Sequence, residues 1–120
     1  MNIQPYYCTF EQAKLLKEKE FLVPTRKGYL SNGDLSNPYY GYEFVNNDTE
    51  NDVIYSAPEQ WQVVEWLRVE KGIWIGVLEH KIKGEGKYYE STVDVMTFSG
   101  YNSPQEAYSA AFNYILTNLI

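Results

Sequence analysis

The sequence has little of the chemistry that metal sites and disulfide frameworks require. Cysteine occurs once, as Cys8, and histidine occurs once, as His80. A single cysteine excludes an internal disulfide framework and a thiolate metal cluster, and a lone thiol is typical of a reducing compartment. No run approaches the roughly 18 consecutive apolar residues that indicate a membrane-spanning helix. Residues 1–5 also lack the features of a secretory signal. We therefore expect a cytoplasmic protein with no membrane association, metal or other cofactor.

Positive charge is also scarce. The chain has 16 Asp and Glu against 10 Lys and Arg, which gives a net charge of −6. This surplus of acids argues against binding of a phosphate backbone as the main role. Apolar residues make up 44% of the 120 residues, which is close to the globular average, and this length suits one core. We expect a single domain over residues 1–120.

Three segments begin with the pattern of a capping box, in which a hydroxyl side chain precedes Glu or Gln by three residues. The three pairs are Thr9 with Gln12, Ser56 with Glu59, and Ser103 with Glu106. Apolar residues then recur at helical spacing, and Gly72 stands where a helix is expected to end. The pattern predicts helices over residues 10–20, 57–71 and 104–118.

Alternating apolar and polar residues predict strands between these helices. Residues 73–82 and 87–98 alternate on either side of the glycine-rich turn 83–86, which is typical of a long β-hairpin. Similar alternation predicts a strand over residues 40–45 and a short one over 53–55. The expected order is helix, one or two strands, helix, two strands, helix. The sequence therefore predicts an α+β domain with three helices packed on a small, mostly antiparallel sheet.

Acidic residues and tyrosines gather in the middle of the chain. Between residues 28 and 67 there are seven acids and no Lys or Arg. Tyrosine accounts for 12 of 120 residues, and it is enriched at protein interfaces because its rigid ring carries a polar tip. We therefore predict a non-enzymatic protein that binds a protein partner with a basic site. The expected contact residues are Tyr40, Tyr42, Asp48, Glu50 and Asp52.

Other uses of the same residues stay open. The tyrosines can instead pack beneath the helices, which would leave no such contact surface. If the acidic surface forms, it can imitate nucleic acid and block a nucleic-acid-binding protein. Two copies of the chain can also pair across a sheet edge.

Two further patterns suggest other binding roles. Lys81, Lys83 and Lys87 flank the hairpin turn beside tyrosines, an arrangement that can bind single-stranded nucleic acid. The acidic loop 48–52, with Glu59 eleven residues after its start, has the oxygen spacing of a calcium loop. Val53, however, occupies the position at which a calcium loop requires glycine. We therefore interpret the loop as a solvated acidic segment without a metal.

A small enzyme of unknown class is the remaining alternative. His80 with Glu79, Glu90 and Asp94 could form an acid–base group on the hairpin, and Cys8 could serve as a nucleophile. No motif for a serine nucleophile, a phosphate-binding loop or a zinc protease is present. Charged residues on the exposed face of a hairpin are the ordinary outcome, so we predict no catalytic residue.

Four stretches resemble proteins of known origin. They comprise residues 9–13 (TFEQA), 56–68 (SAPEQWQVVEWLR), 72–75 (GIWI) and 102–107 (NSPQEA). Together they resemble a family of small uncharacterised proteins of phages and prophages of Bacteroides-type gut bacteria. The resemblance implies an accessory protein of a phage or mobile element that acts in the host cytoplasm. The family has no established activity, so the resemblance assigns no functional residue.

Overall fold

The computed structural model describes residues 4–37, 44–45, 47 and 54–120. Within these residues the chain forms three helices and two three-stranded antiparallel sheets, and the predicted α+β class and order of elements are confirmed. The small sheet has the strand order β2-β1-β3, and the larger sheet has the order β4-β5-β6. The elements are α1 (Phe10–Glu18), β1 (Gly28–Leu30), β2 (Leu35–Ser36), β3 (Ile54–Ser56), α2 (Gln60–Lys71), β4 (Ile75–Ile82), β5 (Gly86–Val93), β6 (Met96–Tyr101) and α3 (Pro104–Asn118).

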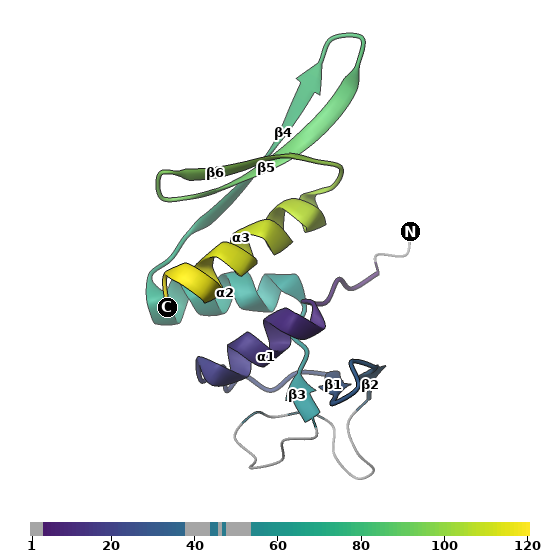
Figure 1. The fold of residues 1–120 in the computed structure, drawn as a ribbon, viewed down its shortest axis with the longest axis vertical. Coiled ribbons are helices and arrows are strands. Elements are labelled where there is room, and N and C mark those ends of the chain that lie inside the picture. Colours follow the sequence, from purple (N-terminus) through teal and green to yellow (C-terminus); the bar gives the residue numbers. More distant parts are fainter. Residues whose placement is uncertain (1–3, 38–43, 46, 48–53) are drawn as a thin grey trace.

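The elements stack in layers, with α3 at the centre (Figure 1). One side of α3 covers the β4–β6 sheet, and the other side faces α1 and α2. The small sheet lies beyond α1, against which β3 packs. The hairpin of β4 and β5 extends past the end of α3 and projects away from the rest of the molecule.

The core explains why α3 can lie so close to its neighbours. Ala107 and Ala111 are fully buried, and their small side chains let the helix backbone approach the sheet and α1. Larger side chains fill the space on either side of this alanine stripe. The buried cluster includes Leu16, Phe21, Val63, Leu67, Val93, Phe112, Ile115 and Leu116.

Two of the three predicted helix starts are confirmed, and one is wrong. The hydroxyls of Thr9 and Ser103 accept backbone N–H bonds at the starts of α1 and α3. Ser56 instead ends β3, where it pairs with Gly28. The next three residues stay extended, because Glu59 forms a bridge with Tyr7, and α2 therefore begins at Gln60 rather than at residue 57.

A residue with a positive φ follows the end of each of the first two helices. Gly72 adopts a left-handed conformation, with φ of 67°, directly after α2, as its sequence position predicts. The first helix is shorter than predicted and ends at Glu18, because Glu20 takes a positive φ of 63°.

The predicted hairpin forms, but its second strand is interrupted. β4 and β5 pair from Ile75 with Val93 to Ile82 with Gly86. The chain turns again after Val93, where Asp94 has a φ of 53°, and β6 pairs back onto β5. Residues 87–98 therefore belong to two strands and a turn. The alternation of polarity continues through this turn, so it did not reveal the break.

The remaining strand predictions have different outcomes. The predicted strand over residues 53–55 corresponds to β3, which is described from Ile54 onward. Residues 40–43 of the other predicted strand lie outside the described residues, and Val45 forms an isolated bridge with Thr25.

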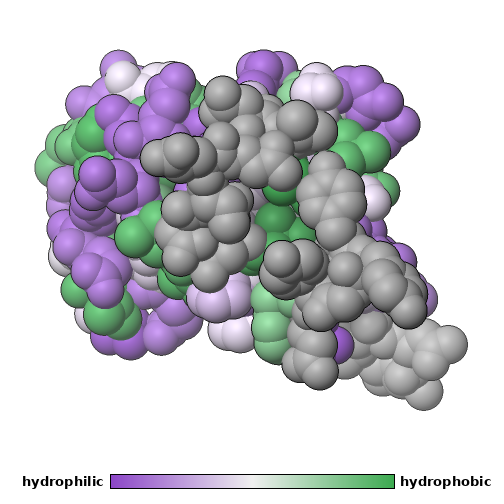
Figure 2. All heavy atoms as spheres, turned by 90° about the horizontal axis from the view of Figure 1, so that it is seen from below, coloured by the Kyte–Doolittle hydropathy of each residue, from purple (hydrophilic) through white to green (hydrophobic). Residues whose placement is uncertain are grey.

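Seen from the end where the small sheet lies, hydrophilic and hydrophobic residues of the described surface are intermixed in small patches (Figure 2). None of the described helices combines the length and the apolar character that crossing a membrane requires.

Candidate protein-binding groove

The predicted contact residues cannot be placed. Tyr40, Tyr42, Asp48, Glu50 and Asp52 all lie outside the described residues, as does the loop with calcium-like spacing. Among the described residues, no three His, Cys, Asp or Glu side chains gather where they could hold a metal ion.

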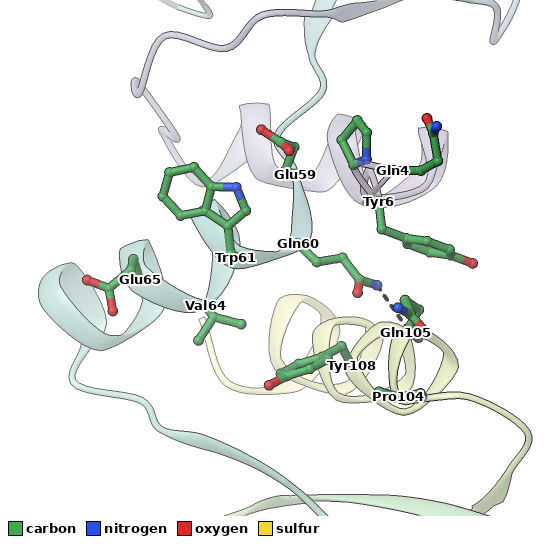
Figure 3. Close-up of a pocket in the computed structure, with 11 residues that line it drawn as sticks. Gln4, Tyr6, Glu59, Gln60, Trp61, Val64, Glu65, Pro104, Gln105 and Tyr108 are labelled. Atoms are coloured by element: carbon green, nitrogen blue, oxygen red, sulfur yellow. Dashed lines mark hydrogen bonds between the residues drawn. The ribbon is translucent and has the colours of Figure 1, made fainter. Parts of the chain in front are cut away.

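A groove lies where the N-terminal segment, α2 and α3 meet (Figure 3). We call it the Trp61 groove. It encloses about 420 Å³ and is lined mainly by apolar atoms. Its described lining consists of Gln4, Pro5, Tyr6, Glu59, Gln60, Trp61, Val64, Glu65, Pro104, Gln105 and Tyr108.

Two backbone hydrogen bonds and one side-chain hydrogen bond connect the three walls of the groove. The N–H of Gln60 donates to the carbonyl oxygen of Tyr6 at 2.8 Å, and the N–H of Cys8 donates to that of Pro58 at 2.9 Å. These bonds hold the N-terminal segment against the start of α2. The side-chain amide of Gln60 donates to the carbonyl oxygen of Gln105 at 3.0 Å and connects α2 to α3 (Figure 3). The groove is therefore preformed.

Aromatic side chains from each wall face the groove. Trp61 extends from the first turn of α2, Tyr108 from α3, and Tyr6 from the opposite N-terminal segment (Figure 3). The side chain of Trp61 is 61% exposed and that of Tyr6 is 52% exposed. Such side chains offer large, rigid contact area at little entropic cost, and they are enriched where proteins bind other proteins.

A second hollow continues the groove along α2. It encloses about 240 Å³ and shares Trp61 and Glu65 with the first. Its other lining residues include Val23 and Val69, which are both exposed. Trp61 thus borders two adjoining apolar depressions.

Carboxylates lie on the Trp61 side of this surface. Glu59 and Glu65 belong to the lining of the groove, and Glu70 belongs to that of the second hollow. Arg68 donates to both carboxylate oxygens of Glu65, at 3.0 and 2.9 Å, and these hydrogen bonds lower the pKa of the Glu65 carboxyl. None of the described lining residues of either hollow is Lys or Arg. The surface is therefore aromatic and negatively charged.

The alternative acid–base group on the hairpin, which the sequence analysis set aside, is only half assembled. Nε2 of His80 lies 2.9 Å from Oε1 of Glu90, and the imidazole stacks on Tyr88 with ring centroids 4.9 Å apart. Glu79 belongs to the opposite face of the hairpin, because neighbouring strand residues point in opposite directions. Asp94 lies in the turn after β5. The structure thus brings together His80 and Glu90 and separates the other two.

The predicted basic patch on the hairpin is partly neutralised. Nζ of Lys87 lies 3.0 Å from Oε1 of Glu79, and this hydrogen bond raises the pKa of the Lys87 ammonium and lowers that of the Glu79 carboxyl. Lys81 is directly opposite Lys87 in the strand register. The patch therefore carries less positive charge than three lysines suggest, and nucleic-acid binding stays a prediction.

Cys8 is placed where a nucleophile would be ineffective. Its side chain is 1% exposed, and burial raises the pKa of its thiol to about 12. Only the thiolate reacts with thiol reagents, and at pH 8 a pKa near 12 leaves about one thiolate in ten thousand.

We expect iodoacetamide at pH 8 to leave Cys8 of the folded chain unmodified over hours and to alkylate it within minutes in urea. Intact-mass spectrometry measures both rates. Fast, stoichiometric labelling of the folded chain would show that the thiol is accessible and would reopen its use as a nucleophile.

Comparison with known proteins assigns no family or function: no family model, curated protein or solved structure matches the chain.

The sequence did not identify the Trp61 groove. In the sequence, Trp61 stands just before the apolar positions of the second helix, and Tyr108 stands beside the small apolar positions of the third. A tryptophan at the edge of an apolar stripe was the available signal.

Proposed function

We propose that the chain is not an enzyme and that it acts by binding another protein at the Trp61 groove. The exposed tryptophan is the observation that carries this proposal. Trp61 leaves most of its side chain in solvent beside Tyr6 and Tyr108, on a surface whose backbone is already fixed. A partner that covers these rings buries apolar surface, and little conformational entropy is lost because the groove is already ordered.

The charge of the surface defines the partner. The described lining residues of the two hollows include three carboxylates and no Lys or Arg, but one of the three, Glu65, is already bound by Arg68. A cationic side chain of a partner can bind Glu59 or Glu70 and can also stack on the face of Trp61. The proposed occupant is a partner segment in which Lys or Arg stands next to apolar residues.

This proposal keeps the kind of partner that the sequence predicted and adds a different contact surface. The sequence predicted an acidic, tyrosine-rich surface and a partner with a basic site. The Trp61 groove supports the same chemistry with residues from α2, α3 and the N-terminal segment. An accessory role in a phage or mobile element is part of the proposal through the sequence resemblance alone.

Selection from a displayed library of random 12-residue peptides tests the proposal. We expect the protein to enrich peptides with Lys or Arg beside apolar residues. Trp61→Ala should weaken binding of the selected peptides at least about 30-fold, because truncated aromatic anchors cost 2 kcal/mol or more. Titration calorimetry measures the loss.

Trp74→Ala is the matched control, because Trp74 is also strongly exposed, at 70%, and does not line the groove. It should bind the peptides as the unmodified chain does. Glu59→Gln combined with Glu70→Gln should weaken binding and reduce its dependence on salt. Failure to enrich any peptide, or equal binding by Trp61→Ala, would overturn the proposal.

A further inference from the structure

The unpaired edge of β4 is a second surface at which another chain can bind. β4 pairs with β5 along one side, and no other described strand pairs with its opposite side. The hairpin carries this edge beyond the helices (Figure 1). An edge strand presents a row of unpaired N–H and C=O groups that can pair with another strand.

The sequence of β4 is complementary to itself. Residues 78–82 read Leu-Glu-His-Lys-Ile. If a second copy of β4 pairs in antiparallel fashion with His80 opposite the partner's His80, Glu79 lies opposite the partner's Lys81. Leu78 then lies opposite the partner's Ile82. Twofold symmetry repeats each pair, so both charges and both apolar side chains are matched twice.

Three of the four side chains are available for such pairing. The fourth, Glu79, already contacts Lys87 through Oε1 at 3.0 Å, so it would be shared between Lys87 and the partner's Lys81. Leu78 is 55% exposed and Ile82 is 41% exposed, and both lie on the face of β4 that also carries His80. The ammonium of Lys81 has no carboxylate within ion-pair distance among the described residues. A lysine on an edge strand usually prevents pairing, but in this register it lies opposite a carboxylate.

The other edge of the same sheet is less suited to pairing. The register between β5 and β6 shifts between Tyr89 and Ser91, which leaves one extra residue in β6. Gly100 of β6 has a φ of 88°, which interrupts the extended backbone there. Such bulges twist an edge and stop another strand from adding to it. β4 is therefore the edge that can extend the sheet, and the extension closes at two copies.

We infer that two copies of this chain form a twofold dimer by antiparallel pairing of β4 with β4, centred on His80. The pairing joins the two larger sheets into one continuous six-stranded sheet. This inference does not depend on the Trp61 groove, since the groove belongs to α2, α3 and the N-terminal segment.

A disulfide at the twofold axis tests the register directly. In this register residue 80 of each copy lies directly opposite its equivalent, with Cβ atoms about 4.5–5.5 Å apart. A disulfide needs about 3.5–4.5 Å, so a shift of the strands by about 1 Å or less allows the bond to form. We expect His80→Cys to form a covalent dimer on mild oxidation, seen on a non-reducing gel. Ile82→Cys is the control and should not, because its equivalent lies four residues away along the strand. The native Cys8 is buried and should not interfere.

Charge reversal tests the same pairing without a covalent link. Sedimentation equilibrium should give the unmodified chain a mass about twice its 14.0 kDa. Glu79→Lys places two ammonium groups opposite each other and should yield monomers. Glu79→Lys combined with Lys81→Glu restores opposite charges and should restore the dimer. Circular dichroism verifies that each variant is folded.

Three results would overturn the inference. They are a monomeric unmodified chain at about 100 µM, equal cross-linking of the two cysteine variants, and a Glu79→Lys variant that remains dimeric. Assemblies larger than a dimer would also contradict it, because the interrupted β6 edge should not extend the sheet.

Discussion

Replacement of Phe112 by alanine is expected to lower the free energy of unfolding by about 3–5 kcal/mol. The ring of Phe112 is fully buried in α3, at the layer between the larger sheet and the other helices. Alanine favours the helix itself, so the whole loss comes from the cavity and from the contacts that the ring gives up. A domain of this length is stabilised by only about 5–15 kcal/mol, so this loss is a large share.

Urea denaturation followed by circular dichroism measures this loss. Phe44→Ala is the control, because the side chain of Phe44 is 51% exposed, and it should lower the free energy of unfolding by less than about 1 kcal/mol. Equal losses for the two variants would mean that α3 does not hold the position described for it.

Gln12 connects the first and third helices through a set of partly buried hydrogen bonds. Gln12 is fully buried, and its Nε2 lies 3.1 Å from the carbonyl oxygen of Ser109, 2.9 Å from the Ser109 hydroxyl and 3.0 Å from Oδ1 of Asn113. Its Oε1 accepts the N–H of Thr9 at 3.0 Å. One side chain therefore caps α1 and also donates to α3, and its removal takes away both connections.

We expect Gln12→Leu to lower the free energy of unfolding by about 1–2 kcal/mol, because the bond that caps α1 and the hydrogen bonds to α3 are lost together. Gln12→Glu keeps the shape but replaces the donor by a carboxylate that faces three oxygen atoms. Burial beside acceptors raises the pKa of the introduced carboxyl in the folded chain. Its proton is then lost more readily from the unfolded chain, so the variant becomes less stable relative to Gln12 as the pH rises from about 4 to 7.

Urea titrations of both chains at pH 4 and pH 7 measure this difference. Gln62→Glu is the matched control, because Gln62 occupies the equivalent capping position of α2 and accepts the N–H of Glu59 at 2.9 Å. A carboxylate can accept the same bond, so we expect a change below about 0.5 kcal/mol. A Gln12→Glu variant with no dependence of its stability loss on pH would contradict the described hydrogen bonds to α3.

Local signals in the sequence predicted most of the fold. The hydroxyls of Thr9 and Ser103 and the glycine at 72 act within one or two turns of helix, so their pattern was sufficient. Ser56 has the same pattern, but its backbone pairs with Gly28 and its N–H donates to Oδ1 of Asn47. Pairing between distant residues overrode the local signal, and no sequence pattern records that pairing.

The candidate site was less accessible to sequence reasoning for the same reason. Tyr6 reaches the groove because the N-terminal segment bonds to the start of α2, and Tyr108 reaches it because α3 packs beside α2. Each side chain alone is an aromatic residue with an ordinary place in a helix or loop. The acidic, tyrosine-rich surface that the sequence predicts belongs to residues 40–52 and stays a prediction, because its contact residues lie outside the described residues.

The contact between α1 and α3 also sets the order in which the chain can fold. Gln12 and Ser109 are 97 residues apart, so their hydrogen bonds close a loop that includes nearly every other element. Closing such a long loop lowers the conformational entropy of the chain before the stabilising contacts form, and this slows folding. During synthesis on the ribosome, the inner face of α1, including Ala13 and Leu16, has no α3 to pack against until α3 itself emerges. The packing of α1 therefore depends on a helix that is translated much later.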